Sequence, residues 1–450
     1  MNYTPYSLLA DVGWISVLLL VGMLARRYVP VIQRLMLPSS ITAGLLGIAL
    51  GPAWLDLIPF SDQLSTYSSI LIAVVFAAIP YTEGFGGVAR GARTMWSYSV
   101  GMYILQWGLA LLFAFAVLGL FFTLPAGFGL LLPAGWAGGF GTAAAVGGTL
   151  EDAGFEGATS LGFTSATAGV FVCIIGGIAI AKWGAARGQT AHISPFDKLP
   201  TDLRTGLVSE DERSSVGVGT TSPSSIESLA AHVALLAATT YIGYLVTRGV
   251  AVLFPSVSVP VFAAAFLVAF VGRLVLHVTP AQRYIDGKTI GSISGSTTDY
   301  LVAFGIASIV PTIVASYALP LLLLMLFGLV YCVVIFRFLT PRMFTEAWLE
   351  RGLFCWGWST ASVATGIALL RIVDPKGKSR TIEEFGLAYV GFAPVEITMA
   401  IAAPVLIANG FGWGFIAVCL VSGIGVLGAA FVLGWVNSAP KTADDKDPVT

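Results

Sequence analysis

The chain has 450 residues, of which 56% are hydrophobic and only 10% are charged, and its mean hydropathy is +0.87. Soluble domains carry about 25% charged residues, so this composition excludes a soluble globular protein. The net charge of −1 says little about binding partners. Apolar runs of roughly 20 residues, long enough to cross a hydrocarbon layer of about 30 Å, recur along nearly the whole chain. We therefore expect an all-α polytopic membrane protein.

The first half of the chain predicts five spans and one stretch that is too polar for lipid. The stretch reads GGFGTAAAVGG (Gly138–Gly148) and lies between the fourth and fifth spans. It favours a re-entrant hairpin or a broken helix at about residues 128–150, packed within protein. Pro38 is expected to kink or interrupt the second span. The five spans are Leu8–Leu24, Ile41–Trp54, Ile70–Val88, Ser99–Phe122 and Ala158–Ala181.

A polar segment at 185–227 joins the two halves. It is rich in Ser, Thr, Gly, Asp and Arg, and a segment of this composition cannot bury a core. We therefore expect it to be a mobile cytoplasmic linker.

The second half repeats the pattern of the first. Its polar stretch reads GWSTASVATG (Gly357–Gly366) and predicts a second hairpin at about residues 350–373. An eleventh apolar run, at 411–436, has no counterpart in the first half, and a polar tail follows at 437–450. The five repeated spans are Leu229–Ala251, Val261–Leu276, Tyr300–Val314, Leu319–Phe338 and Leu387–Ala408.

Basic residues predict the orientation in the membrane. With the N-terminus outside, 22 of the 23 Lys and Arg residues fall in cytoplasmic segments, and only Arg248 does not. Such one-sidedness follows the positive-inside rule. The eleven spans then place the C-terminus in the cytoplasm, and we expect a multi-pass protein of the inner (plasma) membrane.

Five crossings in each half make the two halves point in opposite directions. We therefore predict two inverted repeats, at residues 7–184 and 228–409, each with one hairpin. The first hairpin enters from outside and the second from the cytoplasm. Paired interruptions of this kind typically build the central site of a secondary transporter.

The two polar stretches align with each other and carry the groups that such a site needs. Glycine exposes backbone N–H and carbonyl groups, and hydroxyls donate or accept hydrogen bonds. Exposed N–H groups at helix starts favour carboxylates, whereas carbonyls with hydroxyls favour Na⁺. The alternative is that small residues only allow close helix packing. The predicted substrate contacts are Gly138, Gly139, Gly141, Thr142, Ser359, Thr360, Ser362 and Thr365.

Three carboxylates within or beside spans are candidates for binding a cation. They are Glu83 in PYTEGFGG, Asp299 at the start of the eighth span, and Glu396 in GFAPVEITMA. A lone charge is expensive in hydrocarbon, so such residues usually mark ion or substrate paths. For Glu83 and Asp299, an interfacial position facing water is the open alternative. The same carboxylates would also suit a substrate ammonium or a proton-coupled carrier.

Other classes of function lack support in the sequence. Filters of channels are usually built from several subunits around an axis, which two inverted elements do not provide. There is no P-loop and no pattern typical of a catalytic triad or a metal centre, so we expect neither an enzyme nor a resident cofactor.

The chain resembles the bacterial sodium/glutamate symporters, the ESS family. The resemblance rests on GGFGTAAA at Gly138–Ala145, WSTASVATG at Trp358–Gly366 and LMLPSSITAGLLG near Leu35–Gly47. It implies a homodimer of ten core helices in two inverted repeats, with an elevator-like core that carries L-glutamate or a related small carboxylate together with Na⁺. Phe140 stands where the family signature has histidine, which leaves open aspartate, another amino acid or a different carboxylate.

Overall fold

The computed structural model describes residues 4–35, 37–82, 92–187, 205–208, 210, 213–253, 259–374 and 378–437. These residues form helices and connecting loops, without a strand. Glu83 and the tail beyond residue 437 lie outside the described residues. Eight of the helices are long and apolar enough to cross a membrane. They are α1 (Pro5–Tyr28), α4 (Leu64–Thr82), α5 (Arg93–Ala116), α8 (Ala158–Ala186), α10 (Ser228–Leu253), α14 (Ala318–Val334), α18 (Thr381–Ala408) and α19 (Gly412–Val432).

The remaining helices are shorter or more polar. Two are apolar but short, α3 (Ser39–Leu50) and α11 (Val261–His277), whereas α12 (Gly287–Ala307) is long but rich in hydroxyl side chains. The others are α2 (Pro30–Arg34), α6 (Leu131–Gly135), α7 (Gly139–Asp152), α13 (Pro311–Ser316), α15 (Thr340–Met343), α16 (Trp348–Thr360) and α17 (Val363–Val373), with short turns η2 (Leu118–Leu120), η3 (Phe128–Leu130), η6 (Pro280–Tyr284), η7 (Ile335–Leu339) and η8 (Trp435–Asn437).

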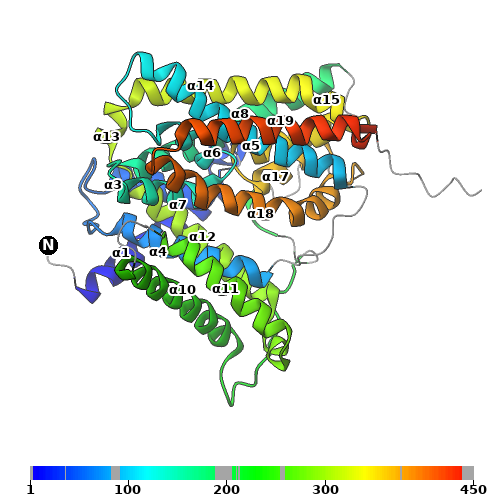
Figure 1. Cartoon of the computed structure of the whole chain (residues 1–450). Helices are drawn as coiled ribbons and strands as arrows, with labels where there is room; N and C mark the ends of the chain where they lie inside the picture. Colours follow the sequence, from blue (N-terminus) through cyan, green and yellow to red (C-terminus); the bar gives the residue numbers. More distant parts are fainter. Residues whose placement is uncertain are drawn as a thin grey trace, which may run out of the picture.

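The helices form two groups that each draw on both halves of the chain (Figure 1). In the first bundle, α12 packs on α3 and α4, α4 packs on α11, and α10 and α1 complete the group. In the second bundle, α5 packs on α18 and α19, and α8 packs on α6, α7 and α16. The first bundle therefore holds α1, α3 and α4 of the first half and α10, α11 and α12 of the second half, and the second bundle holds the later helices with both polar stretches.

Glycines allow the additional helix α19 to lie close along α5. A Cβ at Gly101 would approach Leu427 Cγ to 2.5 Å, and one at Gly108 would approach Cys419 Cβ to 2.6 Å. From the other side, a Cβ at Gly423 would lie 2.7 Å from Leu105 Cγ. Such small-residue seams are typical of helix packing in membranes, where burial from water does not drive association.

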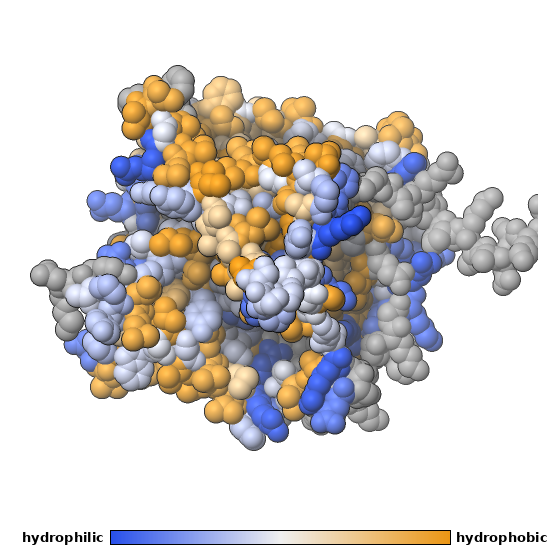
Figure 2. All heavy atoms as spheres, turned by 90° about the horizontal axis from the view of Figure 1, so that it is seen from below, coloured by the Kyte–Doolittle hydropathy of each residue, from blue (hydrophilic) through white to orange (hydrophobic). Residues whose placement is uncertain are grey.

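The outer surface fits a lipid environment. Large apolar side chains such as Leu229, Leu267, Leu322 and Val418 are more than half exposed. Figure 2 shows broad areas of hydrophobic residues on one face, interrupted by smaller hydrophilic groups. Exposed apolar surface on this scale is not tolerated in water. The fold and its surface confirm the predicted all-α polytopic membrane protein.

The predicted start of the eighth span is wrong by about three turns. The span was expected at Tyr300–Val314, but α12 runs from Gly287 to Ala307 and contains the whole Ser/Thr run. The helix tolerates these residues because their hydroxyls bond within it: Ser296, Thr297 and Thr298 each donate to the carbonyl four residues earlier. Asp299 consequently lies inside α12, not at its beginning.

Pro38 also lies elsewhere relative to its helix than was expected. It directly precedes Ser39, the first residue of α3, and adopts an extended conformation with φ −57° and ψ 144°. The proline therefore separates α2 from α3 and does not kink a helix, as its fixed φ and missing N–H favour at a helix start.

The described end of the linker makes hydrogen bonds to the segment that precedes α12. The Asp286 carboxylate, just before α12, accepts hydrogen bonds from the Val218 N–H at 2.9 Å and from the Thr289 hydroxyl at 2.7 Å. Thr220 Oγ1 donates to the Tyr284 carbonyl at 2.7 Å. The Asp286 N–H in turn donates to His232 Nε2 at 2.8 Å.

The Asp286 carboxylate accepts the bond from Val218, so the attachment of the linker to the segment before α12 depends on the charge of Asp286. The Thr289 hydroxyl, followed by the Val218 N–H, lowers the pKa of the Asp286 carboxyl from 3.8 to about 2. A lowered pKa means that the folded state favours the charged form. The stabilisation is therefore complete above the ordinary pKa and is lost as the pH falls toward 2.

Candidate functional site

The first polar stretch forms a break between α6 and α7. The α6 helix ends at Gly135, and α7 begins at Gly139, whose φ of +68° lies in the left-handed region that favours glycine. The Gly138 N–H donates to the Pro133 carbonyl at 2.9 Å, which closes the turn. No side chain caps α7, and the Gly139 N–H donates to the Trp136 carbonyl at 3.2 Å, so the next N–H groups of the first turn are the ones left for a ligand.

The second polar stretch forms a matching break between α16 and α17. The α16 helix ends at Thr360, and Ser362 precedes α17 in an extended conformation. Ser362 Oγ accepts from the Thr365 N–H at 3.3 Å, and the Ser362 N–H donates to Thr365 Oγ1 at 3.1 Å. This reciprocal capping box fixes the start of α17. The two helices then pack so tightly that a Cβ at Gly357 would lie 2.4 Å from Gly366 Cα.

The two breaks touch each other. A Cβ at Gly139 would come within 3.1 Å of the Ala361 carbonyl oxygen, so the first break faces the second directly. Behind them, α8 passes so close that a Cβ at Gly169 would lie 2.3 Å from the Thr360 carbonyl oxygen. Only glycine at these two positions permits the backbones to approach in this way.

A cavity of about 450 Å³ opens where the breaks meet, within the range typical of small-molecule sites. The first bundle contributes α3 and α12 to its wall, and the second contributes both breaks and α18. It therefore lies between the two bundles. Seven of the predicted site residues line it: Gly138, Gly139, Gly141, Ser362, Thr365, Asp299 and Glu396.

Three predicted contacts lie behind the cavity wall. Thr142, Ser359 and Thr360 are buried, and the hydroxyls of Ser359 and Thr360 both donate to the Trp356 carbonyl, at 3.1 Å and 2.7 Å. These hydroxyls stabilise the ends of the helices in this arrangement. Their role as direct ligand contacts stays a prediction, and the role of Glu83 falls outside the described residues.

Three aromatic residues on α18 that share a face with the predicted Glu396 were not among the predicted site residues. Phe385, Tyr389, Phe392 and Glu396 follow one another at intervals of four, three and four residues and all line the cavity. This spacing places them on one face of the helix, and the pattern was available in the sequence. The Tyr389 hydroxyl donates to Glu396 Oε2 at 3.1 Å, so the tyrosine orients the carboxylate.

The cavity contains groups that attract anions, at the starts of helices, and groups that attract cations, the carboxylates. The first turns of α3, α7 and α17 all reach it, and helix N-termini attract anions. Near the start of α3, Ser40 and the Asp299 carboxylate line the same part of the cavity, so a carboxylate of the protein already lies close to this helix start. Of the described lining residues, Asp299 and Glu396 are the charged ones, and both are acidic. The arrangement suits a carboxylate at the two breaks and a cation beside the acidic side chains.

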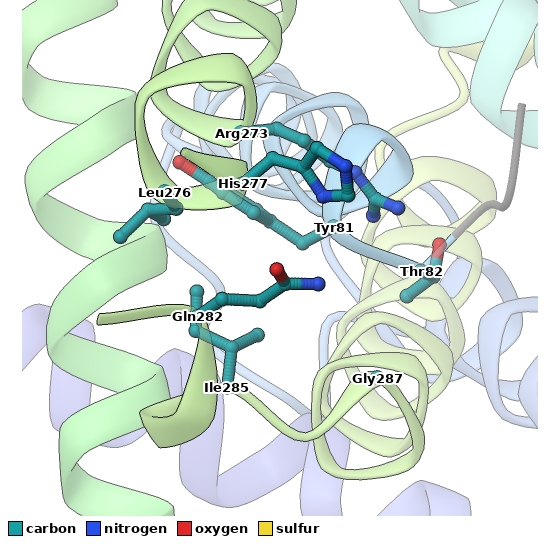
Figure 3. A pocket seen from close by; sticks show the side chains of 8 residues that line it. All are labelled: Tyr81, Thr82, Arg273, Leu276, His277, Gln282, Ile285 and Gly287. Carbon is teal, nitrogen blue, oxygen red and sulfur yellow. The ribbon is translucent and has the colours of Figure 1, made fainter. Parts of the chain in front are cut away.

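A second cavity of about 340 Å³ lies at the ends of α4 and α11, away from the breaks (Figure 3). Arg273, His277 and Gln282 line it, but the Arg273 Nη1 already donates to the Pro80 carbonyl at 2.6 Å and closes the end of α4. None of the predicted site residues that the structure describes lines this cavity. The cavity between the bundles is therefore the better candidate for the site.

A model of the sodium/glutamate symporter family matches residues 7–365. The chain belongs to this family. The match spans α1 through the first turn of α17, so it contains both helix breaks and Asp299. Comparison with curated protein sequences finds no match. The family is one of transporters, which agrees with the many apolar helices of the fold.

Two further side-chain positions help to define the cavity. Phe140, in the first turn of α7, occupies the signature position at which the family resemblance implies histidine. It lines the cavity and stacks on Phe163 with ring centroids 6.2 Å apart. Glu396 and its partner Tyr389 lie on α18, beyond the matched residues. Both features bear on which substrate the cavity accepts.

Proposed function

We propose that the chain is a secondary active transporter that couples the entry of Na⁺ to the uptake of a small carboxylate or amino acid. The observation that carries the proposal is the direct contact of the two helix breaks at a cavity that also holds Asp299 and Glu396. Family membership supports Na⁺ as the coupling ion and glutamate or a related compound as the cargo.

The coupling follows from the charges in the cavity. Without a cation, Asp299 from α12 and Glu396 from α18 place two negative groups in one small space, which is costly at low dielectric constant. A bound Na⁺ offsets this repulsion. The substrate carboxylate then meets N–H groups in the first turns of α7 and α17, next to the Thr365 N–H that Ser362 already caps. Each ligand thereby favours binding of the other, as a symporter requires.

The arrangement of the bundles supports alternating access. We propose that residues 7–184 and 228–409 are inverted repeats joined by the cytoplasmic linker at 185–227, with α19 as an additional span. The breaks act as re-entrant hairpins, and the second bundle moves as an elevator against the first bundle, which forms the interface of a homodimer. The distribution of both halves over both bundles supports this division.

A ligand screen of the full-length protein in detergent tests the proposal. Melting temperatures are measured with a panel of amino acids and dicarboxylic acids in NaCl and in choline chloride. We expect at least one compound to raise the melting temperature only in NaCl, because both ligands bind only the folded state. Stabilisation that is equal in choline and varies with pH indicates proton coupling instead. A panel without effect in either salt contradicts the proposal.

A further inference from the structure

One wall of the cavity between the bundles is aromatic. Trp358 of α16 stacks on Phe392 of α18, with ring centroids 5.3 Å apart and an interplanar angle of 20°. Phe385 and Tyr389 continue this surface along α18 at a centroid distance of 5.6 Å. Phe140 lines the same cavity from the start of α7. These five rings form the aromatic wall.

The polar groups of the cavity are too few for a second substrate carboxylate. Asp299 lines the cavity together with Ser40 at the start of α3, so a substrate anion is better placed at the first turns of α7 and α17. The described lining residues include two carboxylates and no Lys, Arg or His. A side-chain carboxylate on the substrate would therefore add a third negative group beside an apolar surface. Burial of an unpaired charge in such a place is strongly unfavourable.

We propose that the substrate is an amino acid with an uncharged, apolar side chain, which lies against the aromatic wall. This inference rests on the proposed function and narrows its substrate class. The α-carboxylate binds the N–H groups at the two breaks, and the α-ammonium and Na⁺ lie near Asp299 and Glu396. A zwitterion has no net charge, so its binding does not change the net charge of the cavity. Cations are then needed to balance only the carboxylates of the protein. Its side chain gains contact area with five rings.

Binding of four amino acids to the full-length protein tests this inference. Dissociation constants for L-leucine, L-phenylalanine, L-glutamate and L-aspartate are measured by calorimetry in NaCl and in choline chloride. We expect the apolar pair to bind at least about tenfold more tightly than the acidic pair, because the acidic side chains lack a partner. Glutamate that binds as tightly as leucine, or more tightly, overturns the inference and leaves the proposed function standing. Failure of the proposed function would give a different result, because then neither pair of amino acids would show Na⁺-dependent binding.

Variants of Phe140 test the wall itself. Phe140→His introduces ring N–H groups into the first turn of α7, and Phe140→Leu is the matched apolar control. We expect the ratio of glutamate to leucine affinity to rise about tenfold in Phe140→His and to stay near the wild-type value in Phe140→Leu. An equal ratio in all three proteins overturns the role of Phe140 in selectivity. The wild-type measurement decides the substrate class even if a variant does not fold.

Discussion

Replacement of Glu396 by glutamine should reduce Na⁺-driven uptake by about 100-fold, the effect expected from the loss of roughly 3 kcal/mol of cation binding. Glutamine keeps the size of the side chain and still accepts the hydrogen bond from Tyr389, so the change removes little except the charge. The residue lines the cavity next to the two helix breaks. Uptake into proteoliposomes, with the compound that stabilises the protein best, measures the effect.

Tyr389→Phe is the matched control for this prediction. It removes the hydroxyl that orients Glu396 and leaves the carboxylate in place, so we expect a loss of less than about tenfold. The melting temperature without ligand should be close to that of the wild type in both variants. A Glu396→Gln protein with the wild-type dependence of uptake on Na⁺ would show that another group binds the ion.

Replacement of Arg351 by methionine should destabilise the protein by about 3–5 kcal/mol, because it leaves a poorly hydrated carboxylate without its partner. Arg351 of α16 binds Glu384 of α18 through two hydrogen bonds, Nε to Oε2 at 3.0 Å and Nη2 to Oε1 at 2.7 Å. The two side chains are only 10% and 17% exposed. The pair fixes the helix that enters the second break against the helix that carries the aromatic row.

A double variant distinguishes the lost attraction from the cost of the unpaired charge. Arg351→Met combined with Glu384→Leu removes both charges, so we expect it to recover most of the lost stability. Melting curves of the purified protein compare the wild type, the two single variants and the double variant. A double variant no more stable than Arg351→Met would show that packing of the arginine, and not its charge pair, stabilises this contact.

The two breaks were predictable because their composition is unusual in a membrane protein. Runs of Gly, Ser, Thr and Ala such as Gly138–Gly148 neither suit lipid nor bury a soluble core, so the signal is local and survives without knowledge of the fold. The family resemblance rests on the same residues, and the family model confirms it. Local chemistry thus identified seven of the residues that line the cavity.

Features that depend on the partners of a helix were not predictable in the same way. The hydroxyl run of α12 was left outside the predicted span, because its bonds to carbonyls one turn earlier are not visible in composition. Asp11 of α1 is buried, yet it is satisfied by the Ser61 N–H and the Tyr67 hydroxyl, both at 3.0 Å. Both partners come from elsewhere in the chain. The division into two bundles likewise depends on tertiary contacts. Helices that are apolar on all sides show no amphipathic stripe that would indicate which face packs against a neighbour.

The most direct test of the central claim is protection of a cysteine at the contact of the two breaks. Val363→Cys places a thiol in the first turn of α17, on the cavity wall, and the four native cysteines are buried. Ser316→Cys, an exposed position on α13 outside the cavity, is the control. The rate of maleimide labelling is measured with Na⁺, with substrate and with both. The account predicts that labelling at Val363→Cys slows about tenfold only with both ligands, whereas labelling at Ser316→Cys does not change. Equal rates at Val363→Cys in all conditions would contradict it, because the substrate would then bind elsewhere.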